Sequence, residues 1–300
     1  MEVMRPKPGI SLGEKAAFLG PFPSGAPGIF IDTAARLGHS AAIVSGVGED
    51  AFGRSILERL GRDGVNTDHV LSLANRSTGV AFVTYFRDGS REFIFHWDGT
   101  PAVMASAPDP EAIRGSRYFH VMGCSLMANE RFRQEMFLAV ERFAAAGARV
   151  SFDPNIRFEL LAGRSAGEIV DPVLRRCTIL FPGEKEAQLL GGAADPDQAV
   201  EALFRRYPLE VVVLKRGSRG CTVYSAGDRQ EVPAFRVREV DPTGAGDCFD
   251  AGFLCGMLEG RSLRECARLG SAVGALNARS FGPMEGRITP AAAAAMLGRK

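Results

Sequence analysis

The chain has 300 residues, of which 46% are hydrophobic and 24% are charged, and its formal net charge is +1. This composition is typical of a globular protein that can bury the core of one α/β domain, and without a long basic or acidic run it argues against nucleic acid as the main partner. No apolar run approaches the roughly 20 residues of a membrane-spanning helix, and the charged, proline-containing start lacks the apolar segment of a signal peptide.

The N-terminal segments predict strands and helices in alternation. They are the end of a strand at Met1–Met4, a loop rich in Pro and Gly at Arg5–Pro23 with room for a short strand, a helix with a face of small residues within Ser24–Gly38, and a buried parallel strand at Ala41–Gly48. A second helical pattern follows Asp50 and ends at Gly64.

Residues 70–100 predict a small sheet that stands off a single domain spanning residues 1–300. Gly79–Phe86 and Arg91–Trp97 are rich in β-forming residues, and the Asp-Gly pair within Arg87–Ser90 is a strong hairpin signal. Such a sheet is a candidate lid over a binding site. Its aromatic side chains equally suit the interface of a homodimer, and the two roles are compatible.

From residue 118 onward, strands and helices alternate. Strands are expected at Tyr118–Met122, Arg149–Asp153, Thr178–Phe181, Val211–Lys215, Cys221–Tyr224 and Phe235–Val240. Helices are expected at Glu130–Ala146, Ile169–Arg175, Gln198–Tyr207, Gly246–Glu259, Leu263–Ser280 and Pro290–Leu297. This alternation predicts a mostly parallel sheet covered by helices on both faces, with ligands at the carboxyl ends of its strands.

The six cysteines are scattered along the chain, with no C-x-x-C pair. This pattern indicates reduced, mostly buried thiols in a cytoplasmic protein, and it argues against a structural zinc site.

The most informative stretch is VDPTGAGDCFDAGF at Val240–Phe253, where a turn of small residues, Gly244–Gly246, leads into a helix. The free N–H groups and the positive dipole end of a helix N-terminus bind anions. Asp247 follows at once, and a carboxylate beside an anion suits a neutral partner such as a hydroxyl group that attacks a phosphate. The turn matches neither G-x-G-x-x-G nor a Walker loop.

This stretch closely resembles the signature of the PfkB (ribokinase-like) family of sugar kinases, and Ser24–Gly38 resembles the second, glycine-rich signature of that family. The resemblance extends over nearly the whole chain. It implies a ribokinase-like three-layer α/β sandwich with a mostly parallel central sheet and a small β-sheet lid. It also implies ATP-dependent transfer of a phosphoryl group to a sugar hydroxyl with Mg²⁺, and it makes a monovalent cation, K⁺, a further candidate cofactor.

The resemblance implies a role for each part of the two signatures. Asp247 falls on the catalytic base, and Gly244, Ala245 and Gly246 fall on the anion hole. Ser24 and Gly25 match the helix start whose backbone lies against the sugar, and Glu2 stands where an acidic residue grips sugar hydroxyls. Ile29 replaces the sugar-contacting Asn of the family, which removes one expected contact.

Two polar elements follow predicted strands. Asn155 and Arg157 come directly after Arg149–Asp153. Asn155 suits a hydroxyl group, and Arg157 suits a phosphate or the substrate. Alternatively, Asp-Pro-Asn is simply a good turn and Arg157 a surface ion-pair partner. Glu186 matches an N-x-x-E element that holds Mg²⁺ through water, with Gly183 at the Asn position; a carboxylate is also favourable at any helix start.

The nucleotide is expected at two further places by resemblance. Lys215, Gly217 and Gly220 fall on a K-x-G-x-x-G turn along the ATP phosphates and ribose, which as a pattern is also a hairpin turn. Ala275 and Asn277 fall on the helix that walls the adenine pocket.

The substrate is expected to be a neutral ketohexose such as fructose or tagatose. Kinases for 2-keto-3-deoxygluconate that resemble this chain place an Arg where Trp97 stands, but Arg87 and Arg91 lie close by, so a sugar acid is the alternative. A non-catalytic sugar or nucleotide sensor and a nicotinamide-dependent oxidoreductase are two further alternatives. The intact Gly-Ala-Gly-Asp sequence argues against the first, and the C-terminal place of the glycine turn argues against the second.

Overall fold

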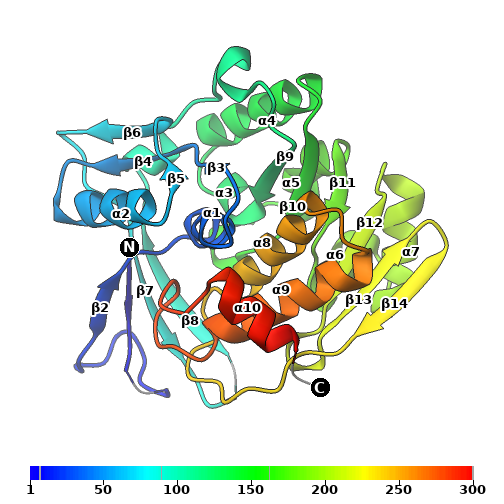
Figure 1. Cartoon of the computed structure of the whole chain (residues 1–300). Helices are drawn as coiled ribbons and strands as arrows, with labels where there is room; N and C mark the ends of the chain where they lie inside the picture. The colour runs from blue at the N-terminus through cyan, green and yellow to red at the C-terminus, as the bar shows by residue number, and fades with distance from the viewer. Residues whose placement is uncertain (7, 89, 162, 299–300) are drawn as a thin grey trace.

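Six strands form the central sheet, in the order β14-β13-β12-β11-β10-β9 (Figure 1). They are β9 (Tyr118–Met122), β10 (Arg149–Asp153), β11 (Cys177–Leu180), β12 (Val211–Lys215), β13 (Cys221–Ser225) and β14 (Asp228–Val232). Strands β9 to β12 are parallel to one another, β13 is antiparallel to β12, and β14 is antiparallel to β13. The computed structural model describes residues 1–6, 8–88, 90–161 and 163–298.

Helices cover both faces of this sheet because its strands are apolar on both sides. In β12, Val211 and Val213 pack into one core, whereas Val212 and Leu214 pack into the other. The first core is closed by α1 (Ala26–Arg36), α8 (Ala245–Leu258), α9 (Leu263–Asn277) and α10 (Pro290–Leu297). The second is closed by α4 (Glu130–Ala145), α5 (Ala166–Leu174), α6 (Glu184–Gly191) and α7 (Pro196–Arg206). The result is a three-layer sandwich.

A second sheet, in the order β2-β1-β7-β8, stands beside the sandwich (Figure 1). The expected hairpin is present as β7 (Val80–Tyr85) and β8 (Arg91–His96), although Gly89 of its turn lies outside the described residues. The N-terminal strand β1 (Glu2–Met4) pairs in parallel with β7, and β2 (Leu19–Phe22) pairs with β1. The lid sheet thus includes the start of the chain as well as the predicted hairpin.

The remaining elements are mostly short and lie in the segments around these two sheets. Strand β3 (Ala41–Ala42) pairs with β5 (Val65–Asn66), β4 (Ser45–Gly48) pairs with β6 (Val70–Leu73), and α2 (Ala51–Arg62) lies between them in sequence. Helix α3 (Gly123–Leu126) follows β9, and single 3₁₀ turns occur at Pro101–Val103, Pro110–Ile113, Phe158–Leu160 and Gly217–Arg219.

Two predicted strands need correction, and strand β14 is an addition. The expected strand Phe235–Val240 is irregular, and the N–H of Val240 donates to the Ala278 carbonyl at 2.8 Å rather than to a neighbouring strand. The expected strand Ala41–Gly48 is interrupted, so that β3 and β4 pair with different partners. Strand β14 was not predicted, since it is polar and mostly exposed at the edge of the sheet.

All six cysteines are buried, and burial raises the pKa of each thiol. Within the described ranges, no helix is long and apolar enough to cross a membrane.

Candidate active site

A cavity of about 1020 Å³ extends between the lid sheet, the carboxyl ends of the central strands and the start of α8. The lid contributes Glu2, Tyr85, Arg91, Phe93, Phe95 and Trp97 to its wall, and the central sheet with the loops that follow its strands contributes Asp153, Asn155, Arg157, Glu186 and Lys215. The turn contributes Gly244, Gly246 and Asp247, and the start of α1 contributes Ser24 and Gly25. Residues expected from four separate segments of the sequence therefore share one cavity.

The turn before α8 is held rigidly by the buried side chain of Asp241. Its Oδ1 accepts hydrogen bonds from the N–H of Thr243 at 3.0 Å and from the Thr243 hydroxyl at 2.6 Å, and its Oδ2 accepts the Gly282 N–H at 2.8 Å. The lid reaches the same place, since the Tyr85 hydroxyl lies 2.6 Å from that of Thr243. Helix α8 therefore begins at a fixed point, with its N-terminus facing the cavity.

Gly244 precedes α8 in the left-handed region, with φ +77°, and a Cβ there would lie 2.7 Å from the Pro283 carbonyl oxygen. The N–H of Ala245 donates to the Pro242 carbonyl at 3.1 Å, so this group is already used within the turn. The N–H groups of Gly246 and Asp247 belong to the first helical turn, which has no intrahelical acceptors. Of the predicted anion hole, Ala245 is therefore engaged within the turn, whereas Gly246, together with the neighbouring Asp247, has an N–H available to a ligand.

Asp247 is 8% exposed and lies in the first turn of α8. Burial and, second to it, the Asp153 carboxylate raise its pKa to about 7, against the opposing effect of Lys215 and Arg157. The amide of Asn155 donates to Asp247 Oδ1 at 3.3 Å. Asn155 itself has a φ of +37°, which Asn tolerates better than most residues. This carboxyl is thus poised to exchange a proton near neutral pH.

Lys215 lies directly beneath the turn. Its ammonium group donates to Asp153 Oδ2 at 2.8 Å and to Asp250 Oδ2 at 3.1 Å. Burial alone would lower the pKa of Lys215, but the carboxylates of Asp153 and Asp250 raise it above its ordinary value. Lys215 therefore stays charged beside Gly246, where a Cβ would be 3.9 Å from the Lys215 nitrogen.

Asp250 was missed in the sequence, and its signal is its place one helical turn after Asp247 on α8. Asp153 was predicted only as the last residue of a strand. Both carboxylates anchor the Lys215 ammonium group at the base of the cavity.

Glu186 connects two loops at the edge of the sheet. Its two carboxylate oxygens accept the N–H groups of Ile156 and Gly183, each at 2.8 Å. Burial and the Asp153 carboxylate raise its pKa. Among the described residues, no cluster of three or more His, Cys, Asp or Glu side chains is arranged to hold a metal ion.

One end of the cavity is built by the lid and the start of α1. Glu2 is 5% exposed, and its Oε2 accepts the Ser24 hydroxyl at 2.5 Å, whereas its Oε1 has no protein partner among the described residues. Gly25 caps α1 with a φ of +104°. Trp97 stacks on Phe95 at 5.4 Å between ring centroids.

Four of the residues expected near the nucleotide do not line this cavity, namely Gly217, Gly220, Ala275 and Asn277. Gly220 is required for packing, since its Cβ would lie 2.1 Å from the Val232 carbonyl oxygen. Asn277 is fully buried and donates to the Thr243 carbonyl at 2.7 Å, so it braces the turn.

Comparisons with known proteins agree with this geometry. A sequence profile described as pfkB family carbohydrate kinase matches residues 23–290. Fructokinase-1 of Oryza sativa subsp. japonica is 32% identical over 284 residues, which cover 91% of this chain and 87% of the relative. A crystal structure of an E. coli protein assigned as a ribokinase II, in complex with ATP and Mg²⁺, is 36% identical with a TM-score of 0.91, over 100% of this chain and 96% of that one. Fructokinase from Vibrio cholerae O395, in its fructose-, ADP- and calcium-bound form, shares the fold with a TM-score of 0.84 at 23% identity, over 99% of this chain and 95% of that one.

The three-layer sandwich, the β lid and the turn that opens α8 define a ribokinase-like kinase. The chain belongs to the pfkB family of carbohydrate kinases, and it is an ATP-dependent carbohydrate kinase. The fold class and the family expected from the sequence are both confirmed.

Proposed function

We propose that this protein transfers the γ-phosphate of ATP to a hydroxyl group of a neutral ketohexose of the fructose type. The observation that carries this proposal is the buried Asp247, whose pKa is about 7, beside the free N–H groups that open α8. The kinship with fructokinases supports the choice of a ketohexose.

In this mechanism Asp247 orients the attacking hydroxyl and accepts its proton. The N–H groups of Gly246 and Asp247 stabilise the charge that develops on the transferring phosphoryl group. The Lys215 ammonium group offsets the negative charge of Asp153 and Asp250 beneath them, which reduces the repulsion of a bound phosphate.

Mg²⁺ bound to the phosphates neutralises part of their charge. Glu186 suits a water-mediated contact to that ion, because each of its oxygens retains a lone pair after accepting one N–H. The Gly217–Gly220 turn and the Ala275–Asn277 end of α9 remain proposed neighbours of the nucleotide, and Asn155 a proposed neighbour of its phosphates. A monovalent cation such as K⁺ is a further proposed cofactor.

The sugar is proposed to lie against Glu2, Ser24, Gly25 and Trp97. The unpartnered Oε1 of Glu2 is a buried acceptor in the cavity wall, and a sugar hydroxyl satisfies it. The indole of Trp97 offers an apolar face for the sugar carbons. Arg157 completes this end, with its guanidinium 5.4 Å from the centroid of the Phe93 ring.

One observation favours a sugar acid as the second candidate. Arg91 and Arg157 both line the cavity and flank the same Phe93 ring. Two guanidinium groups in one wall suit the carboxylate of a substrate such as 2-keto-3-deoxygluconate.

The deciding experiment measures ADP release with ATP and Mg²⁺ across fructose, tagatose, ribose, glucose and 2-keto-3-deoxygluconate, in KCl and in NaCl. Fructose or tagatose is expected to give the highest kcat/KM. Preference for the keto acid would overturn the ketohexose assignment in favour of the second candidate. Release of ADP with none of these sugars would contradict both.

The protein is proposed to work in a reducing compartment such as the cytoplasm, which suits free thiols.

A homodimer that forms through the lid is also proposed. Phe93 and Phe95 of β8 line the cavity, so the alternate residue Ile94 is on the opposite face and is 44% exposed. Phe18 and Leu19 are 37% and 45% exposed. A second copy of the chain would cover these apolar side chains. Light scattering is expected to give a dimer for the wild type and a monomer for Ile94→Glu; a monomeric wild type would refute this interface.

A further inference from the structure

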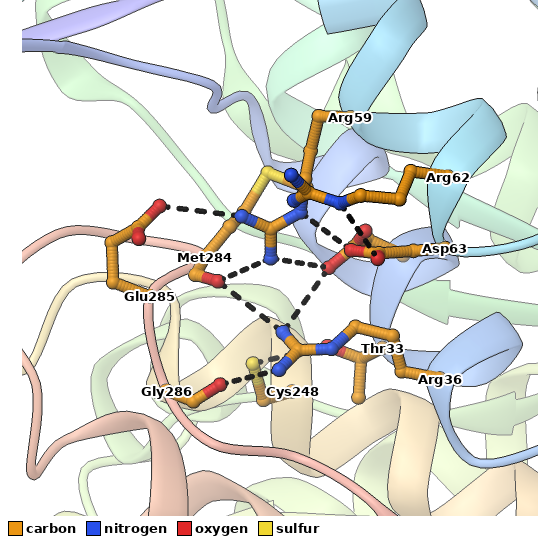
Figure 2. Close-up of polar contacts among 10 residues, drawn as sticks. Thr33, Arg36, Arg59, Arg62, Asp63, Cys248, Met284, Glu285 and Gly286 are labelled. Atoms are coloured by element: carbon orange, nitrogen blue, oxygen red, sulfur yellow. Dashed lines mark hydrogen bonds and ion pairs between the residues drawn. The ribbon is translucent and has the colours of Figure 1, made fainter.

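A cluster of charged side chains lies between α1, α2 and the loop that precedes α10 (Figure 2). Its charged residues are not among those that line the cavity. At its centre is Asp32 of α1, which is 1% exposed. Asp32 Oδ2 accepts hydrogen bonds from Arg36 at 3.4 Å and from Arg59 of α2 at 3.3 Å. Arg59 also donates to Asp63 at 2.5 Å. Both guanidinium groups are thereby held in place by carboxylates.

The remaining N–H groups of these two arginines hold main-chain oxygens of the loop. Arg59 donates to the Met284 carbonyl at 2.6 Å, and Arg36 donates to the Gly286 carbonyl at 2.6 Å and to that of Met284 at 3.2 Å (Figure 2). Arg59 also pairs with the Glu285 side chain at 3.3 Å. The loop has no regular secondary structure, so these contacts determine much of its path.

The same loop touches the turn that opens α8. The N–H of Gly282 donates to Asp241, the residue that holds Thr243, at 2.8 Å. The Pro283 carbonyl oxygen lies 2.7 Å from the position that a Cβ of residue 244 would occupy. A continuous series of contacts therefore runs from Arg59 and Arg36, through residues 282–286, to the proposed anion-binding turn.

We propose that Arg59 and Arg36 are positioning residues for phosphoryl transfer, which hold the loop at residues 282–286 against the turn before α8. A buried ion cluster is a costly way to stabilise a core, since desolvation offsets much of the Coulomb attraction. Here its guanidinium groups end on main-chain carbonyls that no other described side chain holds. The proposal rests on the assignment of that turn as catalytic.

The test compares the same Arg→Lys change at three positions. Lysine retains the charge that neutralises Asp32 but cannot donate to a carboxylate and a carbonyl in the same fork geometry. Arg62 is the matched control, because its side chain is 68% exposed and contacts only Asp63 within the cluster.

Arg59→Lys and Arg36→Lys are expected to lower kcat roughly 5- to 50-fold, since small misplacements of catalytic groups cost up to about 100-fold. KM for sugar and for ATP should change less than about twofold, because the loss falls on the transition state. Arg62→Lys should keep wild-type kinetics. Hydrogen exchange should become faster at residues 282–286 and 243–247 in Arg59→Lys and Arg36→Lys but not in Arg62→Lys. Each kcat is expressed per folded enzyme, with the folded fraction taken from the thermal unfolding signal.

Wild-type kcat in folded Arg59→Lys and Arg36→Lys would overturn the proposal, as would a lower kcat with unchanged exchange in the loop. If Arg59→Lys does not fold, Arg36→Lys decides alone, because Arg59 still neutralises Asp32 in that variant. A wild-type enzyme without kinase activity would instead contradict the proposed function, and the exchange data would still show whether the arginines hold the loop.

Discussion

The paired substitutions Gly244→Ala and Gly246→Ala separate the fold of the turn from its chemistry. Gly244 has a φ of +77°, and an alanine Cβ there would lie 2.7 Å from the Pro283 oxygen and 3.0 Å from Ile29 Cγ2. The left-handed conformation costs a non-glycine residue about 1–2 kcal/mol, and relief of the two contacts moves a loop or a helix at a cost of about 1–2 kcal/mol more. We expect Gly244→Ala to lose about 2–4 kcal/mol of stability, or on the order of 5–10 °C in Tm.

Gly246 is the internal control, since it is one residue inside α8. The nearest atom to an alanine Cβ at this position is the Lys215 nitrogen at 3.9 Å, which is ordinary contact. Alanine is favoured over glycine in a helix by about 1 kcal/mol, so Gly246→Ala should melt at the wild-type temperature or above it. Its methyl group nevertheless enters the cavity wall where the phosphate is proposed to lie, and kcat/KM for ATP should fall roughly tenfold or more.

Thermal unfolding followed by circular dichroism, together with a coupled assay for ADP, measures both quantities on the same preparations. The reasoning fails if Gly244→Ala melts within about 1 °C of the wild type. It fails equally if Gly246→Ala is destabilised as much as Gly244→Ala, because the strain would then not depend on the left-handed conformation.

Three further predictions concern the proposed chemistry. Asp247→Asn should lower kcat roughly 10²–10⁴-fold with little change in the Kd for ATP; turnover near the wild-type value would remove Asp247 as the base. Only the ionised carboxylate accepts a proton, and the pKa of Asp247 is about 7, so kcat/KM should rise with pH to a plateau above about 7. Arg157→Met removes a positive charge that lowers this pKa, and it should therefore move the midpoint of the profile to higher pH. An unchanged midpoint would show that Arg157 does not act on the charge of Asp247. Glu2→Gln should raise KM for the sugar roughly 10-fold or more, since a hydrogen bond to a charged acceptor contributes about 1.5–3 kcal/mol, while KM for ATP stays constant; an equal rise in both would place Glu2 outside the sugar site.

The repeated pattern of strand and helix was sufficient to predict the sandwich, because apolar strands with helices between them have few ways to bury both faces. The same local signals predicted the hairpin Val80–Tyr85 and Arg91–His96. They could not reveal that Glu2–Met4 pairs with β7, since that contact joins segments about eighty residues apart and a three-residue strand carries almost no periodicity.

The proposed site was predictable only where the residue type itself carries the chemistry. Asp247 and its glycine turn have a mechanism that spacing reveals. The bracing roles of Asp241 and Asn277 depend on side-chain contacts with distant backbone groups, as do the contacts of Arg59, and one sequence gives no sign of such partners. The resemblance to sugar kinases placed Asn277 near the adenine, and it gave no sign that the buried Asn277 side chain donates to the Thr243 carbonyl.

The buried thiols of this enzyme can report on local opening of its structure. Cys248 and Cys255 lie on α8, and Cys177 and Cys221 lie in the central sheet. A buried thiol with a raised pKa reacts with an alkylating reagent only when its surroundings open, so each labelling rate measures the free energy of a local or global opening. The free energy of opening of α8 can therefore be compared with that of the central sheet in the native chain, without introducing a cysteine by mutation.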